Sequence, residues 1–198
     1  MKRLAILALP LLLTGCGIGG LLAPAPDDLS SWQAVPLPPD AGLAEAARSQ
    51  TVCRLGAEQG APKVVLQDRR TQWTAAFLVA DAGNAGSCML SSRGGGGGGA
   101  SQPAMQLGAL TEPIAVDEQG GGGLSGGIAT LLGGRAAAAV AAVRIELGNG
   151  QRVEASVGND HWLGWWPGEA RPVAVTAFDA AGRVMVTLAP APDGWAER

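Results

Sequence analysis

Apolar residues occupy every second position of 143–147 and of 153–157, with charged or polar residues between them. Such a period of two predicts two strands that each bury one face. A two-residue Asn149-Gly150 loop would set apolar residues opposite charged ones, whereas a three-residue loop with Gly150 left-handed matches every pair in character. The predicted cross-strand pairs are Ile145 with Val153, Val143 with Ala155, Glu146 with Arg152 and Arg144 with Glu154.

A second hairpin is predicted around the turn 179–182 by the same reasoning. Its predicted pairs are Val173 with Leu188, Val175 with Val186 and Ala177 with Val184. Between the two hairpins, residues 161–166 form a further β-prone run, closed by Pro167 and Gly168. The C-terminal third of the chain is therefore expected to consist of antiparallel strands.

The N-terminal half of the chain predicts one helix followed by short strands. Asp40 can cap a helix that runs to about Leu55, with apolar residues at helical spacing and Gly56 after its end. After Pro62 the period becomes strand-like, which predicts an antiparallel meander. Its strands are 64–66, 73–80 and 87–92, with polar turns at 68–71 and 81–84, and shorter strands follow near 105–110 and 113–116.

These elements predict a mainly β fold with one N-terminal helix, in the α+β class. One-sided alternation favours an antiparallel sheet, or a sandwich or roll of hairpins, within a single domain at 40–198. Glycine runs at 94–99 and 120–123 have no side chains to bury and lose the most backbone entropy on folding. We therefore expect both runs to be loops.

The first residues carry an export signal. Lys2 and Arg3 precede an apolar run at 4–13, which is too short to span a bilayer and has the length of a signal peptide. The run ends in Leu13, Thr14, Gly15 and Cys16. This segment resembles the lipobox of bacterial lipoproteins, although an ordinary signal peptide with a chance cysteine is the alternative.

The lipobox resemblance implies that residues 1–15 are removed and that Cys16 receives the lipid. Acyl chains on Cys16 would then anchor the protein in the membrane on the extracytoplasmic face of the cell. Residues 16–39 are rich in alanine and proline, which predicts an extended tether between this anchor and the domain. Trp32 is unusual in a pure spacer, so the later part of the tether could pack on the domain.

Composition narrows the function further. The chain of 198 residues carries 14 Lys and Arg against 17 Asp and Glu, with no basic block, which argues against nucleic-acid binding. With Cys16 assigned to the lipid, Cys53 and Cys88 remain as an even pair in an exported protein. This predicts a disulfide. Two free thiols or a metal-binding pair are the alternatives.

No credible catalytic set or metal site emerges from the residue types. Residues 123–127 match the G-x-S-x-G of serine hydrolases, but a glycine run precedes the motif and no helix pattern follows it. His161 is the one histidine, and with Asp160 it supplies only two metal ligands. We therefore expect a non-enzymatic protein without a metal or other cofactor.

The most unusual local feature is a tryptophan cluster. Trp162, Trp165 and Trp166 fall within five positions beside His161, and a strand would direct them to both of its faces. One set could be exposed as a flat platform for a sugar or a partner protein, which makes these four residues the candidate contact site. The alternative is that all three tryptophans are covered.

Residues 133–188 also resemble a module of uncharacterised exported proteins from high-GC bacteria. The shared features are Val-Arg-Ile-Glu-Leu, the Asn-Gly turn, Trp-Trp-Pro and Asp-Ala-Ala-Gly-Arg. The resemblance implies a β module and no particular activity. Two functions follow from the sequence: an anchored accessory domain that binds an envelope protein, or a binder of a small ligand or glycan through the tryptophan strand.

Overall fold

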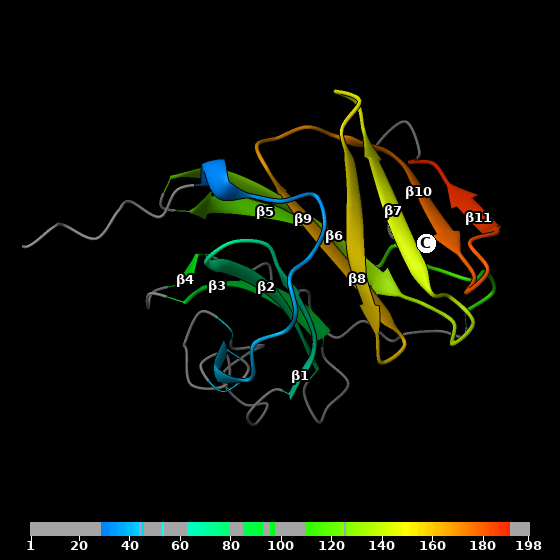
Figure 1. Cartoon of the computed structure of the whole chain (residues 1–198), viewed down its shortest axis with the longest axis horizontal. Helices are drawn as coiled ribbons and strands as arrows, with labels where there is room; N and C mark the ends of the chain where they lie inside the picture. The colour runs from blue at the N-terminus through cyan, green and yellow to red at the C-terminus, as the bar shows by residue number, and fades with distance from the viewer. Residues whose placement is uncertain are drawn as a thin grey trace, which may run out of the picture.

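The computed structural model describes residues 29–43, 45, 53, 63–79, 85–92, 96–97, 110–124 and 126–190 (Figure 1). These residues form two antiparallel sheets, which confirms the predicted mainly β class. The four-stranded sheet, in spatial order β1-β2-β3-β4, contains β1 (Lys63–Arg69), β2 (Trp73–Val79), β3 (Ala85–Ser91) and β4 (Gly96–Gly97). A short 3-10 helix, η1 (Leu29–Ser31), precedes it.

The second sheet has seven strands in the order β11-β10-β7-β8-β9-β6-β5. They are β5 (Glu118–Leu124), β6 (Gly127–Arg135), β7 (Ala142–Leu147), β8 (Arg152–Gly158), β9 (His161–Pro167), β10 (Pro172–Phe178) and β11 (Val184–Leu188). Strand β8 joins two parts of this sheet, since residues 152–155 pair with β7 and residues 156–158 pair with β9.

The molecule therefore has three layers of strands (Figure 1). The middle layer contains β5, β6 and β9, with the four-stranded sheet on one side and β7, β10 and β11 on the other. One core, around Trp73, Phe77 and Trp165, lies between the four-stranded sheet and the middle layer. A second core, around Ile145, Trp162 and Trp166, lies between the middle layer and the outer strands.

The β7–β8 hairpin has the predicted register. All four predicted pairs are present, and Gly150 has φ +84° in a loop of residues 148–150. Two of these pairs place opposite charges together, with 2.7 Å between Arg144 Nε and Glu154 Oε1. Matching apolar and charged positions across the hairpin was sufficient to predict this register because most of its inner face is buried.

The β10–β11 hairpin forms with a register different from the prediction. Val175 pairs with Leu188, and Ala177 pairs with Val186, so β11 is displaced by two residues. A bulge between Ala177 and Phe178 absorbs part of this shift. The Asp179 carboxylate also orders the turn, because it accepts hydrogen bonds from the backbone N–H groups of residues 181 and 183, both at 2.9 Å. Alternation alone does not reveal a bulge.

The predicted N-terminal meander is present as β1, β2 and β3. On its outer face, Leu43 and Cys53 pack against Leu78 and Leu90 in a third, small core. Cys53 and Cys88 form the predicted disulfide, with their Cα atoms 5.3 Å apart.

The predicted helix from Asp40 to Leu55 is only partly described. The Asp40 carboxylate accepts the Gly42 N–H at 2.9 Å, as a helix cap does, and residues 41–43 and 45 are helical. The rest lies outside the described residues, except Cys53. The predicted strand 105–110 also lies outside them, apart from its last residue, and 113–116 forms a single bridge, between Ile114 and Ala136.

The prediction of a loop at 120–123 is wrong, because these glycines form most of strand β5. Each pairs with a residue of β6, so backbone hydrogen bonds compensate for the missing side chains. A Cβ on Gly121 would lie 2.9 Å from the Ala129 carbonyl oxygen, closer than real contacts allow. In the other run, Gly96 and Gly97 form β4, and the remaining positions lie outside the described residues.

Two substitutions in β5 test this account of the glycine strand. We expect Gly121→Ala to destabilise the protein by about 1–2 kcal/mol, since β6 must move away from the new methyl group. Gly123→Ala is the matched control, because a Cβ there meets nothing within 4 Å. It should be neutral or slightly stabilising through the lower entropy of the unfolded chain. Equal unfolding midpoints in urea for the two variants would contradict the account.

Candidate functional site

The three clustered tryptophans are fully buried, so the alternative that all three are covered is confirmed and the exposed-platform hypothesis is wrong. Trp162, Trp165 and Trp166 each have 0% exposed surface. Strand β9 lies in the middle layer, so Trp162 and Trp166 enter one core while Trp165 enters the other. Each indole N–H donates to a backbone carbonyl oxygen at 2.9 Å, those of Ala115, Asp68 and Ala170 respectively. The cluster is therefore structural.

His161 lies on the face of β9 that is directed toward the four-stranded sheet, as Trp165 does, and is partly buried. Its ring lies 4.7 Å from the Phe77 ring, and its Nδ1 lies 2.6 Å from the Asn159 carbonyl oxygen. Its Nε2 is buried without a hydrogen-bond partner. The structure thus places His161 against the meander and does not gather it with the tryptophans into a contact surface.

The strongest concentration of polar interactions is a buried ion pair that was not predicted from the sequence. Asp68 and Arg70 lie at the end of β1, both 0% exposed, where a polar turn was expected. Arg70 Nε lies 2.5 Å from Asp68 Oδ1, and Arg70 Nη2 lies 2.9 Å from Asp68 Oδ2. Burial raises the pKa of the Asp68 carboxyl, and the Arg70 guanidinium opposes that rise. The two charges compensate each other inside the protein.

Arg70 also binds the segment 29–39, which we call the strap. Its Nη1 donates to the carbonyl oxygens of Gln33 at 2.9 Å and Ala34 at 2.6 Å. Its Nη2 donates to the Glu154 carbonyl oxygen of β8. The guanidinium therefore joins the strap, β1 and β8. The fork of five donors in an arginine makes this possible with one side chain.

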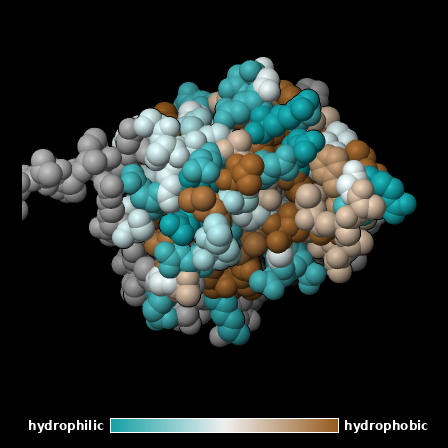
Figure 2. All heavy atoms as spheres, in the orientation of Figure 1, coloured by the Kyte–Doolittle hydropathy of each residue, from teal (hydrophilic) through white to brown (hydrophobic). Residues whose placement is uncertain are grey.

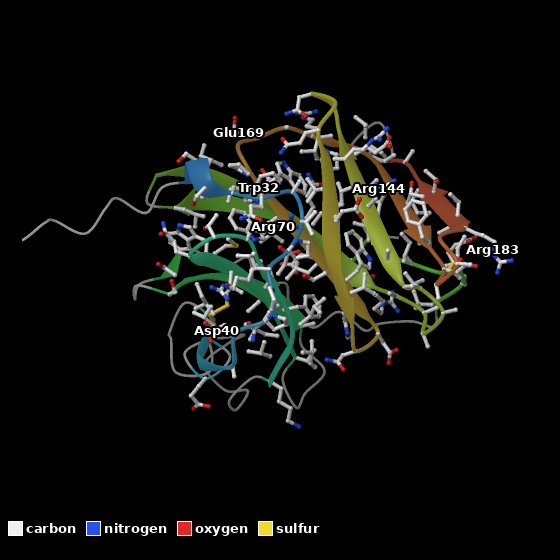
Figure 3. The ribbon with its side chains drawn as sticks, viewed as in Figure 1. Trp32, Asp40, Arg70, Arg144, Glu169 and Arg183 are labelled. Carbon is white, nitrogen blue, oxygen red and sulfur yellow. A yellow bond between two sulfur atoms is a disulfide. The ribbon has the colours of Figure 1, made fainter. Side chains whose placement is uncertain are left out.

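The strap adds its own contacts to those of Arg70. Trp32 stacks edge-on against Trp165 at 6.4 Å between ring centres, and its indole N–H donates to the Trp165 carbonyl oxygen at 3.2 Å. In Figure 3, Trp32 and Arg70 lie next to each other near the middle of the molecule, and the Arg70 guanidinium is 5.3 Å from the Trp32 ring. The Leu37 N–H donates to the Arg69 carbonyl oxygen at 2.6 Å.

The packed chain therefore includes residues from Leu29 onward, so it extends to earlier positions than the predicted boundary at residue 40. Leu29 is itself buried in the core beside Gly127. The sequence signal was Trp32, an apolar residue without a role in a pure spacer. Residues 16–28 of the predicted tether lie outside the described residues.

A second buried polar contact joins β3 to β5. Ser87 Oγ donates to Glu118 Oε1 at 2.6 Å, and each residue is only 2% exposed. Glu118 Oε2 is buried without a partner. Burial raises the pKa of Glu118 to about 7, although the hydrogen bonds from Ser87 oppose this effect. No sequence pattern distinguished Glu118 from a surface carboxylate.

The described residues offer little that would hold a small ligand or metal. A shallow hollow of about 240 Å³ lies at the β8–β9 turn, lined by alanines, Val140, Val157 and the turn residues Asn159 and Asp160. No three His, Cys, Asp or Glu residues gather within the described ranges. The G-x-S-x-G match at 123–127 spans the β5–β6 turn, where Gly126 and Gly127 have positive φ, and not a strand-to-helix elbow.

The feature best suited to binding is the edge of the seven-stranded sheet at β11. This strand pairs with β10 on one side, and none of the described strands pairs with its other side. Met185, Val186 and Leu188 belong to the core but are only partly buried, and Val184 is 62% exposed. In Figure 2, pale and brown residues cover the right-hand end of the face, where β11 lies, with hydrophilic residues at its tip. No charged residue lies within β11.

A comparison with known proteins gives no match: no protein-family model, no curated protein and no solved structure is similar to this chain. No helix in the described part of the chain is long and apolar enough to cross a membrane. The lipobox at Cys16 and the resemblance of residues 133–188 to exported proteins stay predictions from the sequence.

Substitution of Arg70 tests the importance of the buried pair. We expect Arg70→Met to destabilise the domain by about 3–5 kcal/mol, because Asp68 would remain buried without a compensating charge. Arg144→Met is the matched control, since the Arg144–Glu154 pair is about one-third exposed. Its loss should change stability by less than about 1 kcal/mol. Similar unfolding free energies for both variants in urea would contradict the assignment.

Proposed function

We propose that this protein is a lipid-anchored domain of the bacterial cell envelope, on the extracytoplasmic face, that binds another envelope protein without catalysing a reaction. The observation that carries the binding part is the open edge at β11. Its backbone donors and acceptors face outward, and its half-covered apolar side chains leave the adjacent core incomplete. An extended segment from a partner would continue the sheet and cover that core.

The chemistry of β11 specifies the kind of segment it would accept. The strand reads Val-Met-Val-Thr-Leu, and lacks the lysine, proline or inward charge with which edge strands commonly block pairing. An uncharged, β-prone segment, with apolar residues on the face that continues the core, is therefore the best complement. Thr176 and Thr187 form a hydrogen-bonding pair, 3.1 Å apart, on the other face of this hairpin.

The position of the strap also supports β11 as the edge that binds a partner protein. The strap enters the domain at η1, at the opposite end of the long axis from β11 (Figure 1). Twelve residues lie between Cys16 and Leu29, and this stretch of chain spans at most about 45 Å. An anchor at Cys16 would keep the η1 end close to the bilayer and direct β11 away from it. The β11 edge would then be accessible to other envelope proteins.

The burial of the three tryptophans of β9 argues against the alternative function, ligand binding by this strand. That hypothesis required at least one tryptophan of β9 to be accessible to a sugar or small molecule. Because all three are enclosed between strand layers, neither face of β9 offers them.

Lipid attachment has a direct test in the native bacterium. We expect an alkyne-labelled fatty acid to be incorporated into the wild-type protein and to be absent from Cys16→Ser, since the thiol is the acyl acceptor. Cys53→Ser is the matched control and should retain the label, because Cys53 is in a disulfide. Wild-type protein without label, or label that persists in Cys16→Ser, would contradict the anchor.

The β11 edge is tested by site-specific photo-crosslinking in cells. With a benzoylphenylalanine at Thr187, an exposed position on the edge strand, we expect one envelope protein to be crosslinked. The additional substitution Val184→Lys should reduce that product to background, because a charge on the edge opposes strand addition. The matched control is the same crosslinker at Val35, a 59% exposed strap residue.

The identity of the product decides the outcome. A crosslink that maps to an extended, uncharged segment of one envelope protein supports the proposal. Equal products from Thr187 and Val35, no specific product from Thr187, or a product between two copies of this chain would contradict it.

A further inference from the structure

Glu118 occupies an unusual place for a carboxyl group, in the interface between two layers of strands. It begins β5, opposite Gly133 of β6, and reaches across the interface to Ser87 of β3. Ser87 in turn lies opposite Phe77 of β2, which belongs to the core between these layers. Among the described residues, Ser87 is the one hydrogen-bond partner of the Glu118 carboxyl, through its hydroxyl and its backbone N–H, and Oε2 has no partner.

No cation compensates Glu118 among the described residues that surround it. Strands β2 and β3 carry no titratable side chain apart from Cys88, which is in the disulfide, and β4 consists of glycines. Arg135, two residues after Gly133 on β6, lies on the same face as Glu118, and its guanidinium is 2.8 Å from the Asp117 carboxylate, with which it pairs. On β9, His161 is the titratable residue on the same face, and its ring packs on Phe77.

We propose that Glu118 is a pH-sensitive latch between β5 and β3, neutral and closed in acid, and ionised and loosened in alkali. A neutral carboxyl can stay buried with a single hydrogen-bonding residue at modest cost, whereas a carboxylate with the same partner and no cation strongly favours exposure to water. The two glycine-rich strands, β4 and β5, contact each other. Strand β5 is also an edge strand among the described strands of its sheet. Strand β5 can therefore separate from β3 without disturbing the outer layer at β7, β10 and β11.

The direction of the pH dependence follows from the two protonation equilibria. In the open state Glu118 has its ordinary pKa of 4.5, while in the closed state burial raises its pKa to about 7. Between these values the closed state holds a proton that the open state releases. Opening therefore becomes up to tenfold more favourable per pH unit over this interval, about 300-fold in total, and constant above it.

The latch is tested by hydrogen–deuterium exchange of the full folded domain between pH 4.5 and 8.5, corrected for the intrinsic pH dependence of exchange. In the wild type, we expect the opening constant of β5 amides to rise with pH up to about 7 and then level off. In Glu118→Gln it should be nearly independent of pH, because glutamine keeps the shape of the carboxyl group and does not ionise. Glu112→Gln, at an exposed position, is the matched control and should behave as the wild type.

Two further measurements test whether β5 opens locally and whether Glu118 is the group that titrates. Amides of β7 should lack the β5 pH dependence if the latch opens locally, and an identical profile in β7 would overturn the proposal. The carboxyl ¹³C signal of Glu118 should titrate near pH 7, and a midpoint near 4.5 would also overturn it. Ser87→Ala serves if Glu118→Gln does not fold. The hydrogen bond from the Ser87 hydroxyl lowers the pKa of Glu118, so its loss should move the titration midpoint of the carboxyl group to higher pH.

Discussion

The structure depends on a single compensated charge pair enclosed where three segments meet. Asp68 and Arg70 are two residues apart at the end of β1, yet both are removed from water. The pair remains favourable only because each charge is hydrogen-bonded on several sides: Arg70 by Asp68 and three carbonyl oxygens, Asp68 also by the Ser156 N–H at 3.1 Å. These bonds fix the strap, the meander and β8 relative to each other.

The same place links the two larger cores. The Asp68 carbonyl oxygen accepts the Trp165 indole N–H, and Trp32 of the strap packs against both cores. A middle layer with tryptophans on both faces requires covering strands on both sides, and β8 supplies the connection by pairing first with β7 and then with β9. Strand β9 is thus the centre of the molecule. It carries tryptophans on both faces, and each of their indole N–H groups donates to a carbonyl oxygen.

The parts of this fold that followed from the sequence were those governed by local pattern. The β7–β8 register, the β1–β3 meander and the Cys53–Cys88 disulfide were predicted because alternation, turn chemistry and cysteine pairing are local or combinatorial signals. The rest depends on contacts distant in sequence. The glycine strand β5 exists because β6 supplies its hydrogen-bond partners, and burial of Arg70 depends on carbonyl groups from residues 33, 34 and 154. A bulge shifted β11, and a third layer covered the tryptophans of β9.

The strap leads from the proposed lipid anchor to the buried Asp68–Arg70 pair, so its docking in solution is the central claim of this account. Amide hydrogen exchange in the wild-type protein measures it directly. The Glu154 N–H donates to the Ala34 carbonyl oxygen of the strap at 2.9 Å, and the Leu37 N–H of the strap donates to the Arg69 carbonyl oxygen. With the strap docked, both amides should exchange as slowly as those of the neighbouring strands. Exchange of both at the rate of the exposed turn residue Asn149 would contradict it.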